Sequence, residues 1–84
     1  MRAGHKKNTK EMEPQVVIAL ARGLNVLRSF RQGDRFLGNQ EIAERTGLPK
    51  ATVSRLTNTL TVLGYLNHSK RFNQYSLGAA VLSL

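Results

Sequence analysis

The sequence predicts a mainly α-helical fold with a small β-hairpin. Between Asn39 and Leu66, a short helical stretch, a turn centred on Gly47 and a longer helical stretch follow one another. Two short segments rich in Tyr and Leu then flank the polar run 69–73, which is the pattern of a hairpin. The 84 residues are enough for one small domain and too few for two. Together these observations predict one winged helix-turn-helix domain over residues 15–78.

A first helix is predicted over residues 16–31, where apolar residues fall on one side of a helical wheel. We expect this side to form one wall of the core. Its members are Val16, Val17, Leu20, Gly23, Leu24, Leu27 and Phe30, and the largely opposite side carries Arg22, Asn25, Arg28 and Ser29. Ile18 projects near the polar side, where an exposed residue without a role is favoured over a dimer contact.

The second helix follows a turn at residues 32–34, and Phe36-Leu37 is just long enough to add a stub of strand before it. Gly38 or Asn39 can cap this helix, and Glu41 stands in its first turn, where the helix dipole favours an anion. Gly47 then permits a left-handed backbone that ends the helix.

The third helix begins after Pro49, which suits a first turn because no amide donor is needed there, and Gly64 ends it. Its two faces differ. Val53, Leu56, Leu60 and Leu63 form one apolar stripe, and Ala51, Ser54, Arg55 and Asn58 form the opposite stripe. A helix that lies in the major groove of DNA needs small residues for close approach and Arg or Asn to meet base edges. This helix, at about residues 50–63, is therefore the candidate recognition helix.

The hairpin predicted over about residues 65–77 would be the wing. Asn73 at its tip is a tolerable residue for a positive φ angle. Packing beneath the wing is the favoured interpretation for Phe72, with a wedge toward the duplex as the alternative. We expect Tyr65 and Tyr75 to be core or wing-base residues rather than stacking platforms for single-stranded bases.

Charge and composition narrow the function. The chain has 13 Lys and Arg against 5 Asp and Glu, a formal charge of +8, and every charged side chain from Arg45 onward is positive. This distribution favours a polyanionic partner over a charge that serves solubility only. The chain contains no Cys, and its longest apolar run is too short to cross a bilayer, so the cytoplasm is the simplest location and membrane insertion is not indicated. Without paired carboxylates or a metal-ligand cluster, we expect neither an enzyme nor a cofactor.

The chain resembles the N-terminal DNA-binding domain of the isocitrate-lyase-regulator (IclR) family of bacterial transcription factors. The resemblance covers about residues 17–84. The matching segments are Ala21 to Leu27, Glu41 to Lys50, Thr52 to Leu56, Gly64 to Leu66 and Tyr75 to Gly78. Thr57, Thr59 and Thr61 depart from the family pattern, in which Leu or charged residues are frequent, and Phe72-Asn73 stands where Gly is frequent.

The resemblance implies a winged helix-turn-helix joined by a linker helix to a separate effector-binding domain, in proteins that form dimers and often tetramers. Residues 79–84 would be the start of that linker helix, and the chain would be a fragment of a longer protein. A small-molecule effector is then expected only on the C-terminal domain, which is missing here. Such regulators commonly repress or activate catabolic operons. Residues 1–14 are expected to be a flexible basic arm, either plain leader sequence or a segment that lies along DNA.

The candidate site residues divide by the part of the DNA that they would contact. Arg55 is favoured as a base reader over a phosphate clamp, Ser54 and Asn58 can bond base edges, and Ala51 can rest on a thymine methyl. Lys50 and Thr52, beside the N-terminus of the helix, are assigned to phosphates. Lys70 and Arg71 at the wing tip would contact adjacent backbone or the minor groove, and a solvated hairpin tip is the alternative.

Two functions from different classes remain. The first is sequence-specific binding of double-stranded DNA, with a palindromic operator bound by a homodimer or tetramer of the full-length protein. The second is a winged-helix module that binds protein or RNA. The outer stripe of the third helix favours DNA, because a protein-binding module has no need of a basic, uncrowded outer face.

Overall fold

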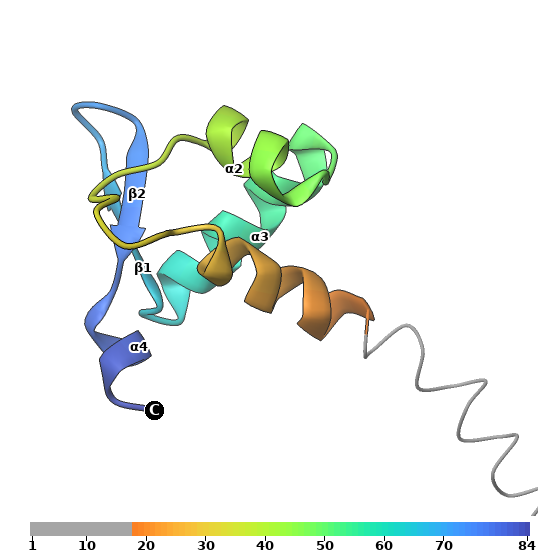
Figure 1. The fold of residues 1–84 in the computed structure, drawn as a ribbon. Coiled ribbons are helices and arrows are strands. Elements are labelled where there is room, and N and C mark those ends of the chain that lie inside the picture. Colours follow the sequence, from red (N-terminus) through yellow and green to blue (C-terminus); the bar gives the residue numbers. More distant parts are fainter. Residues whose placement is uncertain (1–17) are drawn as a thin grey trace, which may run out of the picture.

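The computed structural model describes residues 18–84, so the predicted basic arm over residues 1–14 lies outside the described residues. Within this range a first helix covers residues 18–28. It is followed by α2 (Asn39–Thr46), α3 (Lys50–Val62), β1 (Leu66–Ser69), β2 (Gln74–Leu77) and the short helix α4 (Ala79–Leu82) (Figure 1). Helices dominate this part of the chain and one antiparallel hairpin completes it, which is the fold class that the sequence predicts.

The ends of α2 follow the capping rules that its sequence suggests. Gly38 is the N-cap, and its amide donates a hydrogen bond of 3.2 Å to the Glu41 carboxylate. Gly47 adopts the left-handed conformation at φ 75°, and its amide donates to the Ala43 carbonyl at 2.8 Å. A residue with a Cβ atom would be strained at this angle. The chain therefore leaves α2 at a defined angle.

The corner between α2 and α3 is held by Thr46 and Leu48. The Thr46 hydroxyl donates to the Ile42 carbonyl at 2.8 Å and accepts from the Leu48 amide at 3.3 Å. Leu48 packs against the core, and Pro49 is the extended residue that precedes α3. The turn is thus closed by one hydroxyl and one apolar side chain.

The wing pairs β1 with β2, placing His68 opposite Tyr75. The predicted strand stub is also present, because Leu37 and Tyr75 exchange two backbone hydrogen bonds of 2.8 and 2.7 Å. Asn73 at the tip has φ 51°, in agreement with its expected role. The packing expected for Phe72 is wrong: its side chain is 62% exposed, because the hairpin tip extends beyond the body of the domain.

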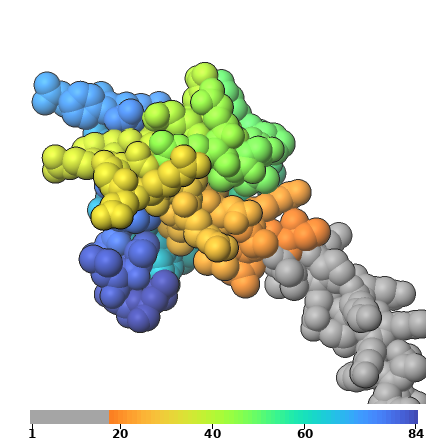
Figure 2. Space-filling view, viewed as in Figure 1, coloured from red at the N-terminus to blue at the C-terminus, as the bar shows by residue number. Residues whose placement is uncertain are grey.

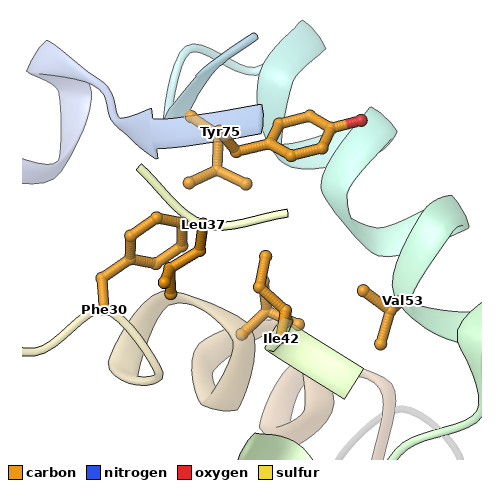
Figure 3. Close-up of a cluster of buried hydrophobic side chains, with 7 residues drawn as sticks. Phe30, Leu37, Ile42, Val53 and Tyr75 are labelled. Carbon is orange, nitrogen blue, oxygen red and sulfur yellow. The ribbon is translucent and has the colours of Figure 1, made fainter. Parts of the chain in front are cut away.

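The core lies where the first helix, α2, α3 and the wing meet. Its members are Val26, Phe30, Leu37, Ile42, Val53, Leu66 and Tyr75, of which five are labelled in Figure 3. Leu27, Ala43, Leu48, Leu56 and Leu60 pack around them. Side chains from helices, strand stub and wing thus share one cluster, so the wing is fixed relative to the helices.

The inward face of the first helix differs from the predicted one. Val26 is fully buried and Ser29 is 7% exposed, whereas Leu20 and Leu24 are 62% and 45% exposed. The helix is rotated so that Val26 points at the centre of the core, whereas Leu20 and Leu24 lie outside the buried cluster. Leu20, Leu24 and Leu63 line an apolar groove, and Leu63, at the end of the apolar stripe of α3, is 59% exposed rather than part of the core.

A close backbone approach connects the end of α3 to the end of the wing. Gly78 is buried, and its amide donates to the Tyr65 carbonyl at 2.8 Å. A Cβ atom at Gly78 would overlap the carbonyl oxygen of Gly64. Only glycine therefore fits at the point where β2 leads into α4.

Candidate nucleic-acid interface

The outer face of α3 presents the four residues that the sequence selects. Ala51, Ser54, Arg55 and Asn58 are all exposed, whereas Val53 on the inner face is fully buried. Successive residues of an α-helix are about 100° apart, which puts these four on the side away from the core. The face combines small side chains, hydrogen-bonding groups and one guanidinium.

Thr57 fixes the orientation of this face. Its side chain is fully buried, and its hydroxyl lies 3.0 Å from Asn39 Oδ1 and 3.1 Å from the Ser54 carbonyl oxygen. Thr61 likewise donates to the Thr57 carbonyl at 2.7 Å. Two of the unusual threonines of α3, Thr57 and Thr61, thus have a structural role that periodicity did not reveal, because a threonine does not stand out as a core residue. The Thr57–Asn39 bond ties α3 to the first turn of α2.

An ion pair holds α2 against the end of the first helix. Arg45 Nη1 lies 2.6 Å from Asp34 Oδ2 and also donates to the Ser29 carbonyl at 2.7 Å, while the Arg31 amide donates to Asp34 at 2.7 Å. The hydrogen bond from Arg45 and then that from Arg31 lower the pKa of Asp34 below its ordinary value of 3.8. Asp34 in turn raises the pKa of Arg45. The sequence pattern gives no sign of this pair, because only the fold brings the two side chains together.

The N-terminus of α3 is positively polarised. Lys50 is exposed and Thr52 is half-buried, both in the first turn. This turn carries no acidic residue and its amides receive no side-chain cap. Free amides and the helix dipole favour an anion at such an end. The geometry is therefore compatible with the phosphate role expected for Lys50 and Thr52.

The wing tip exposes Lys70 and Arg71. The Arg71 guanidinium carbon lies 5.1 Å from the centroid of the Phe72 ring, within the range of a cation–π contact. His68 Nε2 lies 3.0 Å from Asn73 Oδ1, and this bond braces the turn. Both cations are thus carried on a tip with internal order.

The elements that carry these two groups of residues lie on the same side of the molecule. In Figure 1 the α2–α3 corner and the wing tip both lie at the top, whereas the first helix and α4 lie below. Within residues 18–84 the one ion pair is Asp34–Arg45, so Lys50, Arg55, Lys70 and Arg71 have no carboxylate partner there. These four cations are therefore not neutralised by an ion pair within residues 18–84.

Other kinds of site receive no support from the described residues. In the range 18–84, no cluster of His, Asp and Glu side chains is arranged to hold a metal ion. No helix of this range combines the length and the apolar character needed to span a membrane.

Comparison with known proteins gives a consistent result. The family model of the IclR helix-turn-helix domain matches residues 19–69. The chain is 47% identical over 85 residues to the HTH-type transcriptional regulator TsaQ1/TsaQ2 of Comamonas testosteroni, covering 98% of this chain and 30% of that protein. It is 40% identical over 72 residues to the Pca regulon regulatory protein of Pseudomonas putida, covering 86% of this chain and 24% of that protein.

Solved structures show the same likeness. An IclR family transcriptional regulator from Brucella abortus superposes with a TM-score of 0.79 at 53% identity, over 89% of this chain and 28% of that one. An IclR homolog from Microbacterium hydrocarbonoxydans, crystallised with 4-hydroxybenzoate, gives a TM-score of 0.72 at 25% identity, over 77% of this chain and 27% of that one. The chain thus spans less than a third of the length of these relatives, which are regulators rather than enzymes.

Proposed function

The chain belongs to the IclR family of transcriptional regulators, and we propose that it binds double-stranded operator DNA in a sequence-specific manner. The family membership supports a DNA-binding role in transcription regulation. The observation that carries the finer proposal is the outer face of α3, which is exposed, small and hydrogen-bonding, with one guanidinium and no carboxylate. A helix of 13 residues with such a face suits the major groove.

Within this proposal, Arg55 reads a guanine through its O6 and N7 atoms, a contact worth about 1–3 kcal/mol of discrimination. Ser54 and Asn58 bond base edges, and Ala51 lies against a thymine methyl. Arg55 is exposed and lies one turn inside the N-terminal end of α3, the part of a recognition helix that reaches the bases. These four residues would supply sequence information.

The remaining site residues would supply affinity. Lys50 and Thr52 bind phosphates at the N-terminus of α3, and Lys70 and Arg71 follow adjacent backbone or the minor groove. Exposure of the three cations and the absence of acidic residues in the first turn of α3 support these roles. Such contacts position the protein without reading sequence.

The assembly is also part of the proposal. A homodimer, or a tetramer built from dimers, would place two α3 helices on half-sites of a palindromic operator. The exposed leucines of the apolar groove, Leu20, Leu24 and Leu63, support a contact between copies, since patches of this kind commonly mark interaction surfaces. Residues 79–84 would begin the linker to a separate effector domain, and the protein would act in the bacterial cytoplasm on a catabolic operon.

Fluorescence-anisotropy titration tests the proposed function. The probes are a duplex from the intergenic region upstream of the gene and a scrambled duplex of equal composition, each at two salt concentrations. We expect tighter and less salt-sensitive binding to the native duplex. Arg55→Ala should lose discrimination at one position per half-site, whereas Lys70→Ala should weaken all duplexes alike and flatten the salt dependence.

The alternative is a winged-helix module for protein or RNA. Equal affinity for both duplexes with no effect of Arg55→Ala would contradict sequence reading. Tighter binding to a single-stranded RNA of the same sequence would favour the RNA-binding alternative.

A further inference from the structure

A second basic surface lies beside the outer face of α3. A cleft of about 180 Å³ separates the first helix from α3 and is lined by Ala19, Arg22, Thr52, Arg55, Leu56 and Thr59. In Figure 2 the first helix, in orange, lies directly against the green segments at the α2–α3 corner. The cleft therefore joins a helix outside the helix-turn-helix to the N-terminal half of α3.

The chemistry of the cleft suits an oxyanion. Arg22 and Arg55 supply two guanidinium groups, both exposed, and neither forms an ion pair within residues 18–84. Thr52 and Thr59 add two hydroxyls that can donate hydrogen bonds. Guanidinium groups match phosphate oxygens in geometry as well as charge.

The electrostatics of the cleft also call for an anion. Two like charges that line one small cleft repel each other, and no carboxylate lines it. Ala19 and Leu56 make part of the wall apolar, which reduces screening by water. An anion bound at Arg22 would offset this repulsion and leave the Arg55 guanidinium free for its proposed contact with a base.

The position of Arg22 indicates which anion. Thr52 and Arg55 belong to the part of α3 proposed to enter the groove, whereas Arg22 projects from a different helix alongside it. Phosphates line both edges of a groove, so a side chain that flanks the inserted helix meets backbone rather than base edges. We propose that this cleft binds a phosphate of the DNA backbone and that Arg22, which the sequence analysis placed on a merely polar side, is its principal ligand.

This inference rests on the proposed function, because it requires duplex DNA to lie along α3. Each phosphate contact contributes about 0.9 to the slope of log affinity against log salt. Replacing Arg22 by Ala should therefore lower the magnitude of that slope by about 0.9, which corresponds to about an eightfold loss of affinity in 0.1 M salt. The loss should be equal for native and scrambled duplexes, since a phosphate carries no sequence information.

The test is a salt series of anisotropy titrations on the chain and three variants, with a mixed-sequence duplex and the native one. Arg22→Ala removes the ligand and Arg22→Lys keeps its charge. Arg35→Ala removes one exposed positive charge from a loop that does not line the cleft, and so controls for net charge. Thermal melts of each variant report whether the fold is retained, which matters because Arg22 lies on the first helix, which contributes Val26 to the core.

We expect Arg22→Ala to show the loss in affinity and slope, Arg22→Lys to recover most of the slope, and Arg35→Ala to change either quantity by less than half as much. If Arg22→Ala behaves like Arg35→Ala while the parent chain still binds DNA, the phosphate site is refuted and the proposed function stands. If the parent chain binds neither duplex, the proposed function itself fails, and the inference falls with it.

Discussion

Replacing Thr57 by valine tests how the recognition helix is oriented. Thr57 is fully buried, and its hydroxyl donates to Asn39 Oδ1 at 3.0 Å, across the α2–α3 junction. Valine has nearly the same shape and similar helix propensity, so the substitution removes the hydroxyl and little else. The change therefore removes the bond to Asn39 together with the 3.1 Å bond to the Ser54 carbonyl oxygen, and a double-mutant cycle with Asn39→Ala separates the bond between the two helices.

The expected cost is about 1 kcal/mol. A typical intramolecular hydrogen bond contributes about 0.5–1.5 kcal/mol net, and a buried acceptor left without a partner costs about 1–3 kcal/mol. Asn39 is half-buried, so water can reach its freed oxygen and the cost falls toward the lower end of these ranges. In a domain of this size, 1 kcal/mol lowers the melting temperature by about 4–8 °C.

Urea unfolding followed by circular dichroism measures the loss. Thr59→Val is the matched control, because Thr59 is exposed on the same helix and its replacement should change stability by less than about 0.5 kcal/mol. A double-mutant cycle with Asn39→Ala should give a coupling energy of at least about 0.5 kcal/mol. If Thr57→Val is as stable as the parent chain, or the cycle shows no coupling, the hydroxyl does not fix α3 on α2.

Three further predictions concern stability. Gly78→Ala should destabilise the fold by about 1–3 kcal/mol in urea unfolding, because its Cβ would overlap the Gly64 carbonyl, and an unchanged midpoint would refute this close approach. Ile42→Ala should cost about 2–5 kcal/mol through a core cavity, and a loss below 1 kcal/mol would show that this site is not close-packed. The lowered pKa of Asp34 stabilises the fold at pH values above the ordinary pKa, and this stabilisation is lost as the pH falls below about 4 through the lowered pKa. Asp34→Asn should therefore lower stability at pH 7 and weaken the decline in acid, whereas parallel pH profiles would exclude a role for the pair with Arg45.

Local signals allowed much of the fold to be predicted. The predicted ends of the turn and of α3 agree with the observed ends to within one residue. They were placed from Gly47, Pro49 and Gly64, because the backbone conformation at these positions depends on the residue itself. The positive φ of Asn73 was predicted for the same reason, and the stub at Leu37 was predicted from a short apolar segment between a turn and a helix.

Predictions that depended on tertiary packing were less accurate. The first helix has more apolar surface than the core covers. Periodicity therefore could not show that Val26 is buried and that Leu24 is exposed. For the candidate site, exposure of the outer face of α3 agrees with the prediction, but the buried Thr57 was missed. The cleft at Arg22 was missed as well, because it arises from the placement of two helices that periodicity treats separately.

The most direct test of the central claim is to map the DNA contact surface by nuclear magnetic resonance. Uniformly ¹⁵N-labelled chain would be titrated with the native duplex, and amide shift changes would be followed along the sequence. We expect the largest changes in residues 50–58 of α3 and 70–73 of the wing tip, with small changes around Leu24 and Leu63. Changes confined to the apolar groove, with α3 and the wing tip unaffected, would contradict DNA reading by this face.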